Sequence, residues 1–258
     1  MTKALFFDID GTLVSFDTHR IPDSTHLALA EARRRGLKLF IATGRPRCII
    51  NNLGDELFDG YITMNGACCF MGQYEQMIFR HTIPSDDVRA AMQMSLEEEI
   101  TTIFVSADSM YIVNPNEKIE WFSRSLNVDP PLVLSPEEIL KKEIFQISPF
   151  ITVDREPAFM RGMPHSEVGR WHPIFTDIVA AGTGKQRGID EVTKYLGIRV
   201  EETMAFGDGG NDIGMLKHVG IGVAMGNAAA EVQQAADYVT DTVDNDGILK
   251  ALLHFRLI

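Results

Sequence analysis

The stretch Ala4-Leu5-Phe6-Phe7-Asp8-Ile9-Asp10-Gly11-Thr12-Leu13-Val14 decides how the rest of this sequence is interpreted. Its first four residues are apolar and predict a short buried strand that ends at Asp8. Asp8 and Asp10 are two residues apart, so both carboxylates point into the crevice where open α/β sheets bind ligands. Two carboxylates so close repel each other unless a cation lies between them, and Mg²⁺ prefers such oxygen ligands. Gly11 allows a sharp turn and offers its amide to an anion. A turn without chemistry is the alternative.

Short apolar runs alternate with helical patterns through the first 65 residues, and again after Phe175. The first part predicts a helix that opens at Pro22 and ends at Gly36, then a strand over 37–42, a short helix over 46–53 and a strand over 61–64. The last part predicts helices over 183–196, 211–217, 228–236 and 247–254, and strands over 203–206 and 220–224. Strands that alternate with helices form βαβ units. Together the two parts predict one α/β core, with a doubly wound parallel sheet covered on both faces.

Residues 84–172 follow a different pattern, namely helix, two strands, helix, strand, helix and strands, with frequent prolines. Ser135-Pro136-Glu137-Glu138 predicts a capping box at the start of one of these helices. The mixture predicts an inserted α+β domain, with a discontinuous core domain made of 1–83 and 173–258. The insert holds 8 Lys and Arg against 15 Asp and Glu, a net charge of −7, which disfavours a polyanionic substrate.

The composition argues against several classes of protein. With 24 Lys and Arg against 36 Asp and Glu, the 258 residues carry a net charge of −12, which disfavours binding to nucleic acid or to an anionic membrane. The three cysteines show no C-x-x-C spacing, so a reducing compartment fits better than a disulfide scaffold. The apolar run at the N-terminus is too short for a signal peptide, and no apolar stretch is long enough for a membrane span. We therefore expect a cytoplasmic protein that is a monomer or a weak homo-oligomer.

Two further motifs lie where predicted helices begin. Thr43-Gly44-Arg45 follows a buried strand, and its hydroxyl, glycine amide and helix N-terminus would cradle a phosphate; a common strand-to-helix turn is the alternative. Thr183-Gly184-Lys185-Gln186 predicts a capping box that places Lys185 in the first helical turn. A cation there opposes the helix dipole by about 0.3–1 kcal/mol unless an anion binds beside it. An ordinary solvated lysine is the alternative.

The stretch Gly207-Asp208-Gly209-Gly210-Asn211-Asp212 follows another predicted strand. Its glycines and short polar side chains predict a tight acidic loop that could complete a Mg²⁺ shell. A plain N-cap would account for one of the aspartates. It would not account for Asp208 and Asp212 together.

In this order, the four motifs resemble those of the haloacid dehalogenase (HAD) superfamily, whose members have a Rossmann-like core. An insert between Thr43 and Lys185 resembles the C2B-type cap of that superfamily. Three motifs are similar to those of the Cof-like subfamily IIB phosphatases, namely Thr43-Gly44-Arg45, Met64-Asn65-Gly66-Ala67 and Met225-Gly226-Asn227-Ala228. Residues 8–14 and Arg170-Trp171 are especially similar to Bacteroides-type sugar (hexose) phosphate phosphatases.

This resemblance implies a mechanism and a set of site residues. Asp8 would be the nucleophile that forms an aspartyl-phosphate, and Asp10 would be the general acid and base. The implied ligands of Mg²⁺ are Asp8, Asp10 through its backbone carbonyl, and Asp208, with Gly209 and Asp212 around them. The implied phosphate- and substrate-binding residues are Ile9, Gly11, Thr43, Gly44, Arg45, Lys185 and Asn211. Candidate contacts to the leaving group are Arg45, Asn65, Arg170 and Trp171.

The expected function is hydrolysis of a small phosphorylated metabolite, with a hexose or pentose phosphate as the first choice. A nucleotide or cofactor phosphate is an alternative substrate. A phosphomutase of the phosphomannomutase-like branch would share every core motif, but the acidic insert offers few cations for a second phosphate. A receiver-type signalling domain is much shorter and lacks a counterpart of Asp10. A binding module without activity is expected to lack at least one of the residues Asp8, Asp10, Lys185 and Asp208.

Overall fold

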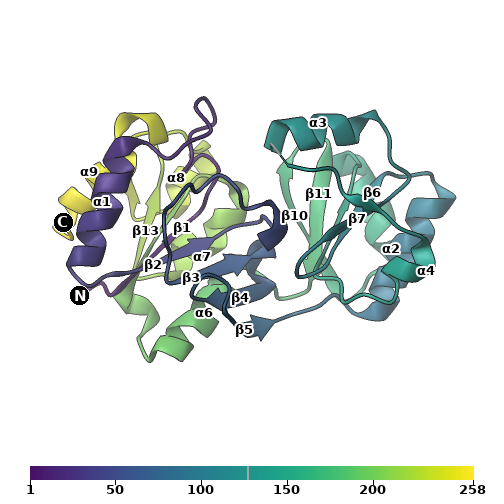
Figure 1. The fold of residues 1–258 in the computed structure, drawn as a ribbon, viewed down its shortest axis with the longest axis horizontal. Coiled ribbons are helices and arrows are strands. Elements are labelled where there is room, and N and C mark those ends of the chain that lie inside the picture. The colour runs from purple at the N-terminus through teal and green to yellow at the C-terminus, as the bar shows by residue number, and fades with distance from the viewer. Residues whose placement is uncertain (127) are drawn as a thin grey trace. The chain divides into compact units, whose positions relative to one another are not determined.

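The computed structural model describes residues 1–126 and 128–258 and divides into two compact units (Figure 1). The first unit comprises residues 1–44, 52–80 and 184–258, and the second comprises 45–51 and 81–183. The predicted insert, 84–172, lies wholly within the second unit, while the predicted domain boundaries stay a prediction. The side chains of Leu126 and Trp171 lie outside the described part, and with them the predicted contact of Trp171 to a leaving group.

An eight-stranded sheet forms the centre of the first unit, in the order β14-β13-β12-β1-β2-β3-β4-β5. Its strands are β1 (Ala4–Phe7), β2 (Lys38–Ala42), β3 (Gly60–Thr63), β4 (Cys68–Met71), β5 (Gln76–Arg80), β12 (Thr203–Gly207), β13 (Ile221–Ala224) and β14 (Tyr238–Val239). The six strands from β14 to β3 are parallel, which confirms the predicted doubly wound α/β core. The antiparallel pair β4 and β5 at the edge was not predicted, because the glycine-rich sequence around it hides a hairpin.

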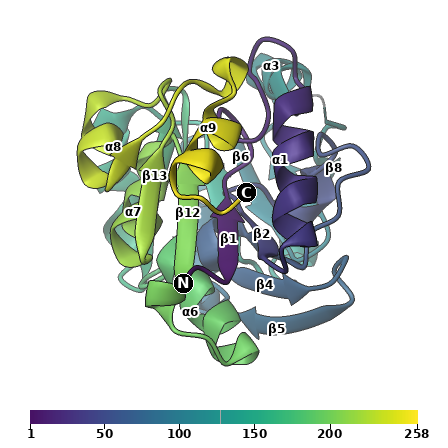
Figure 2. The ribbon, with the colours of Figure 1, turned by 90° about the vertical axis from the view of Figure 1, so that its left-hand side faces the viewer.

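Helices pack against both faces of this sheet. They are α1 (Asp23–Arg34), α6 (Lys185–Leu196), α7 (Ile213–His218), α8 (Ala230–Ala235) and α9 (Gly247–His254). Alternate strand residues such as Phe6 and Phe40 pack with Ile189 of α6 and Met215 of α7 in one buried cluster. Since neighbouring strand residues point to opposite faces, Leu5 and Phe7 face the other side, where α1 lies beside α9 (Figure 2).

Three predicted helices begin or extend differently in the structure. The helix predicted over 46–53 is wrong, because only a 3-10 turn forms at Arg47–Ile49, in a segment of β-branched and Asn residues with low helix propensity. The capping box at Thr183 is also wrong: α6 begins at Lys185 after Gly184, with no side-chain cap. The Thr183 hydroxyl lies 3.0 Å from Nδ1 of His81 instead. In the acidic loop, a 3-10 turn at Gly210–Asp212 precedes α7.

The second unit contains a six-stranded sheet in the order β10-β11-β9-β6-β7-β8, antiparallel except between β7 and β8. Its strands are β6 (Thr102–Val105), β7 (Met110–Val113), β8 (Leu132–Val133), β9 (Gln146–Pro149), β10 (Ser166–His172) and β11 (Phe175–Ala180). Its helices are α2 (Ser85–Glu97), α3 (Glu117–Leu126), α4 (Pro136–Ile139) and α5 (Glu156–Phe159). The predicted α+β character is confirmed, as is the capping box of Ser135 and Glu138.

No helix among the described residues is long and apolar enough to cross a membrane.

The 3-10 turn at Met64–Gly66 gives a prediction about stability. Gly66 has φ +97°, and a Cβ atom there would lie 2.1 Å from the carbonyl oxygen of Gly184, at the start of α6. Gly36 has a similar φ of +84° but nothing within 4 Å. We expect Gly36→Ala to lower the free energy of unfolding by about 1 kcal/mol through backbone strain alone. Gly66→Ala should cost about 2 kcal/mol more, because backbone must also move.

Chemical denaturation of both variants measures this difference. Equal losses of stability in the two variants would contradict the close approach of the Met64–Gly66 turn to the start of α6.

Candidate active site

Asp8 directly follows β1, and its backbone N–H still donates to the carbonyl of Phe206 in β12 at 3.0 Å. The chain then folds into a tight turn, in which the carbonyl of Ile9 accepts from the amides of Leu13 and Val14 at 3.0 and 2.8 Å. The Ile9 side chain is buried in the core, so only its backbone can serve the site. The turn fixes Asp8 and Asp10 at the carboxyl end of the central strand, as predicted for a ligand site of an open sheet.

Lys185 is the first residue of α6, and its side chain is fully buried. Its ammonium Nζ donates to Oδ1 of Asp8 at 2.7 Å and to Oδ1 of Asp212 at 2.5 Å. Burial alone would lower the pKa of Lys185, but the two carboxylates raise it above its ordinary value, so the ammonium stays charged. The structure therefore excludes an ordinary solvated lysine at this position.

The acidic loop after β12 is held by Asp212. While Oδ1 of Asp212 accepts from Lys185, Oδ2 accepts from the backbone amides of Asp208 and Gly209 at 3.0 and 2.8 Å. One oxygen of Asp212 thus ties the loop to Lys185, and the other holds the loop backbone. This arrangement leaves Asp212 as a positioning residue and directs Asp208 towards Asp8.

Asp208 is anchored by two side chains from other parts of the first unit. Its Oδ1 accepts from the Thr12 hydroxyl at 2.8 Å, and its Oδ2 accepts from Nδ2 of Asn227 at 3.3 Å. Gly11 is required beside it: φ is +82°, and a Cβ atom there would lie 2.2 Å from Oδ2 of Asp208. The prediction that its amide binds an anion is wrong, because this amide donates to the carbonyl of Val14 at 2.9 Å. Sequence reasoning missed the anchoring roles of Thr12 and Asn227, although both lie within motifs that were recognised.

The surroundings of Asp8 and Asp208 disfavour the ionised form of their carboxyl groups. Burial raises the pKa of Asp8 well above its ordinary value, an effect that Lys185 opposes and the neighbouring carboxylates reinforce. Burial, followed by the charge of Asp212, raises the pKa of Asp208 to about 7. Carboxylate oxygens of Asp8, Asp208 and Asp212 lie within 4.8 Å of one another, an arrangement able to hold a metal ion. Lys185 bonds to only two of these three carboxylates, so a divalent cation with hard oxygen ligands fits the charge and chemistry of the site.

The second motif directly follows the neighbouring strand β2. Thr43 is buried, and its amide donates to the carbonyl of Ile62 at 2.9 Å. Gly44 follows it, and a Cβ atom at Gly44 would lie within 3.5 Å of the carboxamides of Asn65 and Asn211. Oδ1 of Asn65 accepts from Nδ2 of Asn211 at 2.9 Å. The structure thus gathers Thr43, Gly44 and Asn211 at one place in the first unit, together with Asn65.

Two predicted substrate contacts have other partners. Arg45 belongs to the second unit, where its buried guanidinium donates to the carbonyl of Ile49 at 2.9 Å. Arg170 pairs with Glu156 at 2.5 Å, and its other guanidinium nitrogens donate to carbonyls, including those of Ile151 and Phe175 at 2.9 Å. Arg170 therefore serves the structure of the second unit, which argues against a leaving-group contact.

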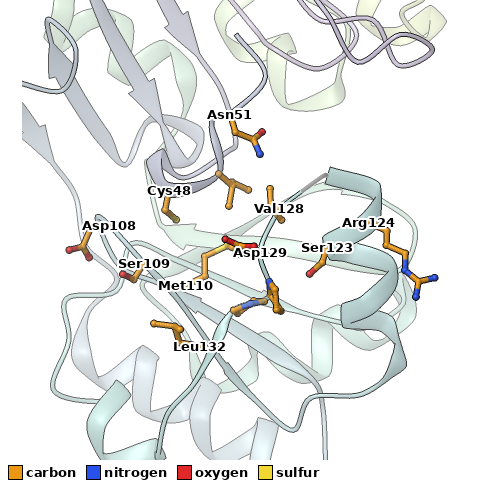
Figure 3. Close-up of a pocket in the computed structure, with 13 residues that line it drawn as sticks. Cys48, Asn51, Asp108, Ser109, Met110, Ser123, Arg124, Val128, Asp129 and Leu132 are labelled. Carbon is orange, nitrogen blue, oxygen red and sulfur yellow. The ribbon is translucent and has the colours of Figure 1, made fainter. Parts of the chain in front are cut away.

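The second unit also contains a cavity of about 690 Å³ (Figure 3). The side chains of Asp108, Ser109 and Asp129 line it, with Met110 and Leu132 as apolar walls. Cys48 also lines it, but burial, then the charge of Asp108, raises the pKa of this thiol to about 11. Because the thiolate is the nucleophile, the raised pKa leaves little reactive thiolate at Cys48 near neutral pH.

Comparisons with known proteins agree with this geometry. The family model of haloacid dehalogenase-like hydrolases matches residues 5–252. A solved structure of the HAD subclass IIB sugar phosphatase BT4131 is 51% identical, with full coverage of both chains and a TM-score of 0.94. YkrA of Bacillus subtilis, named as a candidate phosphatase, is 35% identical over 100% of this chain and 99% of its own. YcsE of Bacillus subtilis, a 5-amino-6-(5-phospho-D-ribitylamino)uracil phosphatase, is 29% identical over 99% of this chain and 96% of its own.

The chain therefore belongs to the haloacid dehalogenase-like hydrolases. Within them it is a phosphatase of the Cof-like subclass IIB type, as the sequence motifs predicted.

Asp208 should give the metal-free protein a characteristic pH dependence. Its pKa is about 7 in the folded protein, against an ordinary value of 3.8, so between these values the folded state holds a proton that the unfolded state has released. The free energy of unfolding therefore contains a contribution that is fully present below pH 3.8 and is lost as the pH rises through about 7. Asp8 contributes with the same sign.

In EDTA, we expect the stability of the wild-type protein to fall over this interval, and that of Asp208→Asn to fall less steeply. Thermal unfolding between pH 4 and 8 measures both slopes. Asp17→Asn, at an exposed position, should keep the wild-type slope. Parallel curves for Asp208→Asn and the wild type would show that Asp208 does not carry the raised pKa.

Proposed function

We propose that this protein hydrolyses small sugar phosphates through an aspartyl-phosphate on Asp8, with Mg²⁺ bound in the acidic site. The observation that carries the proposal is the ammonium of Lys185, buried 2.7 Å from Asp8 while Asp208 and Asp212 stand close by. A nucleophilic carboxylate needs positive charge around it to meet a phosphate dianion. The site supplies one buried cation and the ligands for another.

In the first half-reaction, a carboxylate oxygen of Asp8 attacks phosphorus in line with the leaving oxygen. The bond between Asp8 and phosphorus forms as the bond to the sugar oxygen breaks, which yields an aspartyl-phosphate. Phosphoryl transfer depends mainly on positioning and on stabilising the charge of the equatorial oxygens. Lys185 supplies this charge, and Thr43 with the Gly44 amide supplies hydrogen bonds.

Asp10 is proposed to act as the general acid in the first step and as the general base in the second. It donates a proton to the departing sugar oxygen, and its carboxylate then takes a proton from the water that attacks the aspartyl-phosphate. This second attack releases inorganic phosphate and restores Asp8 and Asp10. The turn at Ile9–Val14 keeps Asp10 two residues beyond the nucleophile, where it can serve both steps.

Mg²⁺ is proposed to be held by the Asp8 carboxylate, the Asp10 backbone carbonyl and Asp208. When bound, it supplies charge neutralisation for the buried carboxylates and for the phosphoryl group. Thr12 and Asn227 hold Asp208 in place, and Asp212 holds the backbone of the loop. These neighbours explain how a carboxylate with a raised pKa stays oriented as a ligand.

A sugar phosphate is the proposed substrate for two reasons. The solved structure that is 51% identical belongs to a sugar phosphatase. The acidic insert, with 15 Asp and Glu against 8 Lys and Arg, disfavours substrates with several phosphates. The named activity of YcsE, on a phosphorylated ribitylaminouracil, supports the phosphate ester of a polyol joined to a nitrogen heterocycle as the second candidate.

Replacement of the two carboxylates should separate their roles. Asp8→Asn should abolish turnover of every ester, because the amide is a poor nucleophile. Asp10→Asn should lower kcat by about 10²–10⁴-fold for a sugar phosphate, and by less for 4-nitrophenyl phosphate, whose leaving group needs no proton. Steady-state kinetics with both esters, on preparations shown to be folded, measures this. Equal losses on the two esters would contradict the acid role of Asp10.

A substrate panel tests the proposed class. With Mg²⁺, kcat/KM for glucose 6-phosphate and ribose 5-phosphate should exceed that for a nucleoside monophosphate, pyridoxal phosphate and a phosphopeptide. Differences among the sugars should stay small, since hydrogen-bonding pockets distinguish close polyols by about 1–3 kcal/mol. A nucleotide or peptide that leads the sugars by about tenfold, or roughly 1.4 kcal/mol, would overturn the sugar assignment and leave the phosphatase intact.

A further inference from the structure

The turn after β3 has positive φ at three consecutive residues, and two of them are not glycine. Met64, Asn65 and Gly66 have φ values of +49°, +53° and +97°. Positive φ is unfavourable for residues other than glycine and persists where the surrounding structure imposes it, often at functional sites. Here the amide of Asn65 donates to the carbonyl of Thr43 at 3.0 Å, so the strained turn is tied to the second motif.

Asn65 is only 7% exposed, and only one of its two polar side-chain atoms has a hydrogen-bond partner. Its Oδ1 accepts from Nδ2 of Asn211 at 2.9 Å, which fixes the orientation of the carboxamide. Its Nδ2 is buried and has no hydrogen-bond partner among the described residues. An unsatisfied buried donor is unfavourable, so its retention in a strained turn calls for a partner that the protein itself does not supply.

The position of this donor limits what the partner can be. A Cβ atom on Gly44 would lie 3.3 Å from Nδ2 of Asn65, so the donor faces the space that the missing Gly44 side chain leaves open. A carboxamide N–H cannot bind a cation, and it requires an acceptor. Both Thr43 and Gly44 belong to the proposed phosphate cradle.

We infer that Asn65 is a substrate-binding residue whose carboxamide N–H donates to an oxygen of the transferred phosphoryl group. This inference rests on the proposed function and replaces the predicted contact of Asn65 with the leaving group. Asn211 contributes by fixing which end of the Asn65 carboxamide faces the phosphate. The donor therefore serves every substrate alike, whatever its leaving group.

The test is binding of inorganic phosphate in the presence of Mg²⁺, measured by calorimetry and as product inhibition. Asn65→Asp keeps an oxygen for Asn211 and tolerates positive φ, but it replaces the donor with an anionic acceptor. Asn65→Gly removes the side chain and accepts the backbone conformation without strain. A hydrogen bond to a charged group supports an expected loss of phosphate affinity of about tenfold or more in each variant.

Asn114 provides a matched control in the second unit. It also has a positive φ, +48°, but its Nδ2 donates to the carbonyls of Ser95 and Ile100 at 2.7 and 3.2 Å. Asn114→Asp should therefore lower Tm and leave phosphate affinity unchanged. The Asn65 variants should show the opposite pattern.

The outcomes separate this inference from the proposed function. If the wild-type protein hydrolyses no phosphate ester, the proposed function fails. If it does, and both Asn65 variants bind phosphate as tightly as the wild type, the inference about Asn65 is overturned. A loss of affinity for sugar phosphates, with binding of inorganic phosphate unchanged, would also overturn it and would return Asn65 to the leaving group.

Discussion

The buried ion triad of Lys185 with Asp8 and Asp212 is the interaction on which the first unit depends. The ammonium joins the end of β1, the start of α6 and the acidic loop after β12, and its bond to Asp8 alone spans 177 residues of the chain. Removing one partner from a buried ion group leaves an uncompensated charge, which costs about 3–5 kcal/mol. The triad therefore fixes the position of Asp8, and through Asp212 it also fixes the loop that carries Asp208.

The same interaction leaves the site short of positive charge. Three carboxylates, two of them buried, cluster near one ammonium, and burial together with the neighbouring carboxylates raises the pKa values of Asp8 and Asp208. A bound divalent cation would relieve this, and a phosphoryl group would then meet Lys185, the Thr43–Gly44 segment and the donor of Asn65. The burial and the mutual repulsion that make the carboxylate cluster unfavourable are therefore the features that would make binding of metal and phosphate favourable.

Much of the fold could be predicted because short stretches of sequence determine its strands and helices. The apolar run before Asp8 and the βα alternation gave the parallel core, and the Ser135 capping box was confirmed. What could not be predicted depends on contacts that are distant in sequence or, for the hairpin of β4 and β5, on a local sequence without a clear strand pattern. Thr183 contacts His81 rather than capping α6, and β4 pairs with β5 behind an uninformative glycine-rich stretch. The anchoring of Asp208 by Asn227 and the unsatisfied donor of Asn65 likewise exist only once separate strands meet. The roles of the motif residues, the cytoplasmic location and the oligomeric state stay predictions.

Covalent phosphorylation of Asp8 is the step that the proposed mechanism requires. It is tested most directly by quenching the enzyme during turnover of a sugar phosphate with Mg²⁺, reducing any acyl phosphate with borohydride, and locating the product by peptide mass spectrometry. Reduction of the Asp8 carboxyl to an alcohol is expected, dependent on substrate and absent from Asp8→Asn. Reduction at a different residue, or turnover with no reducible acyl phosphate under conditions that trap a known aspartyl-phosphate enzyme, would contradict it.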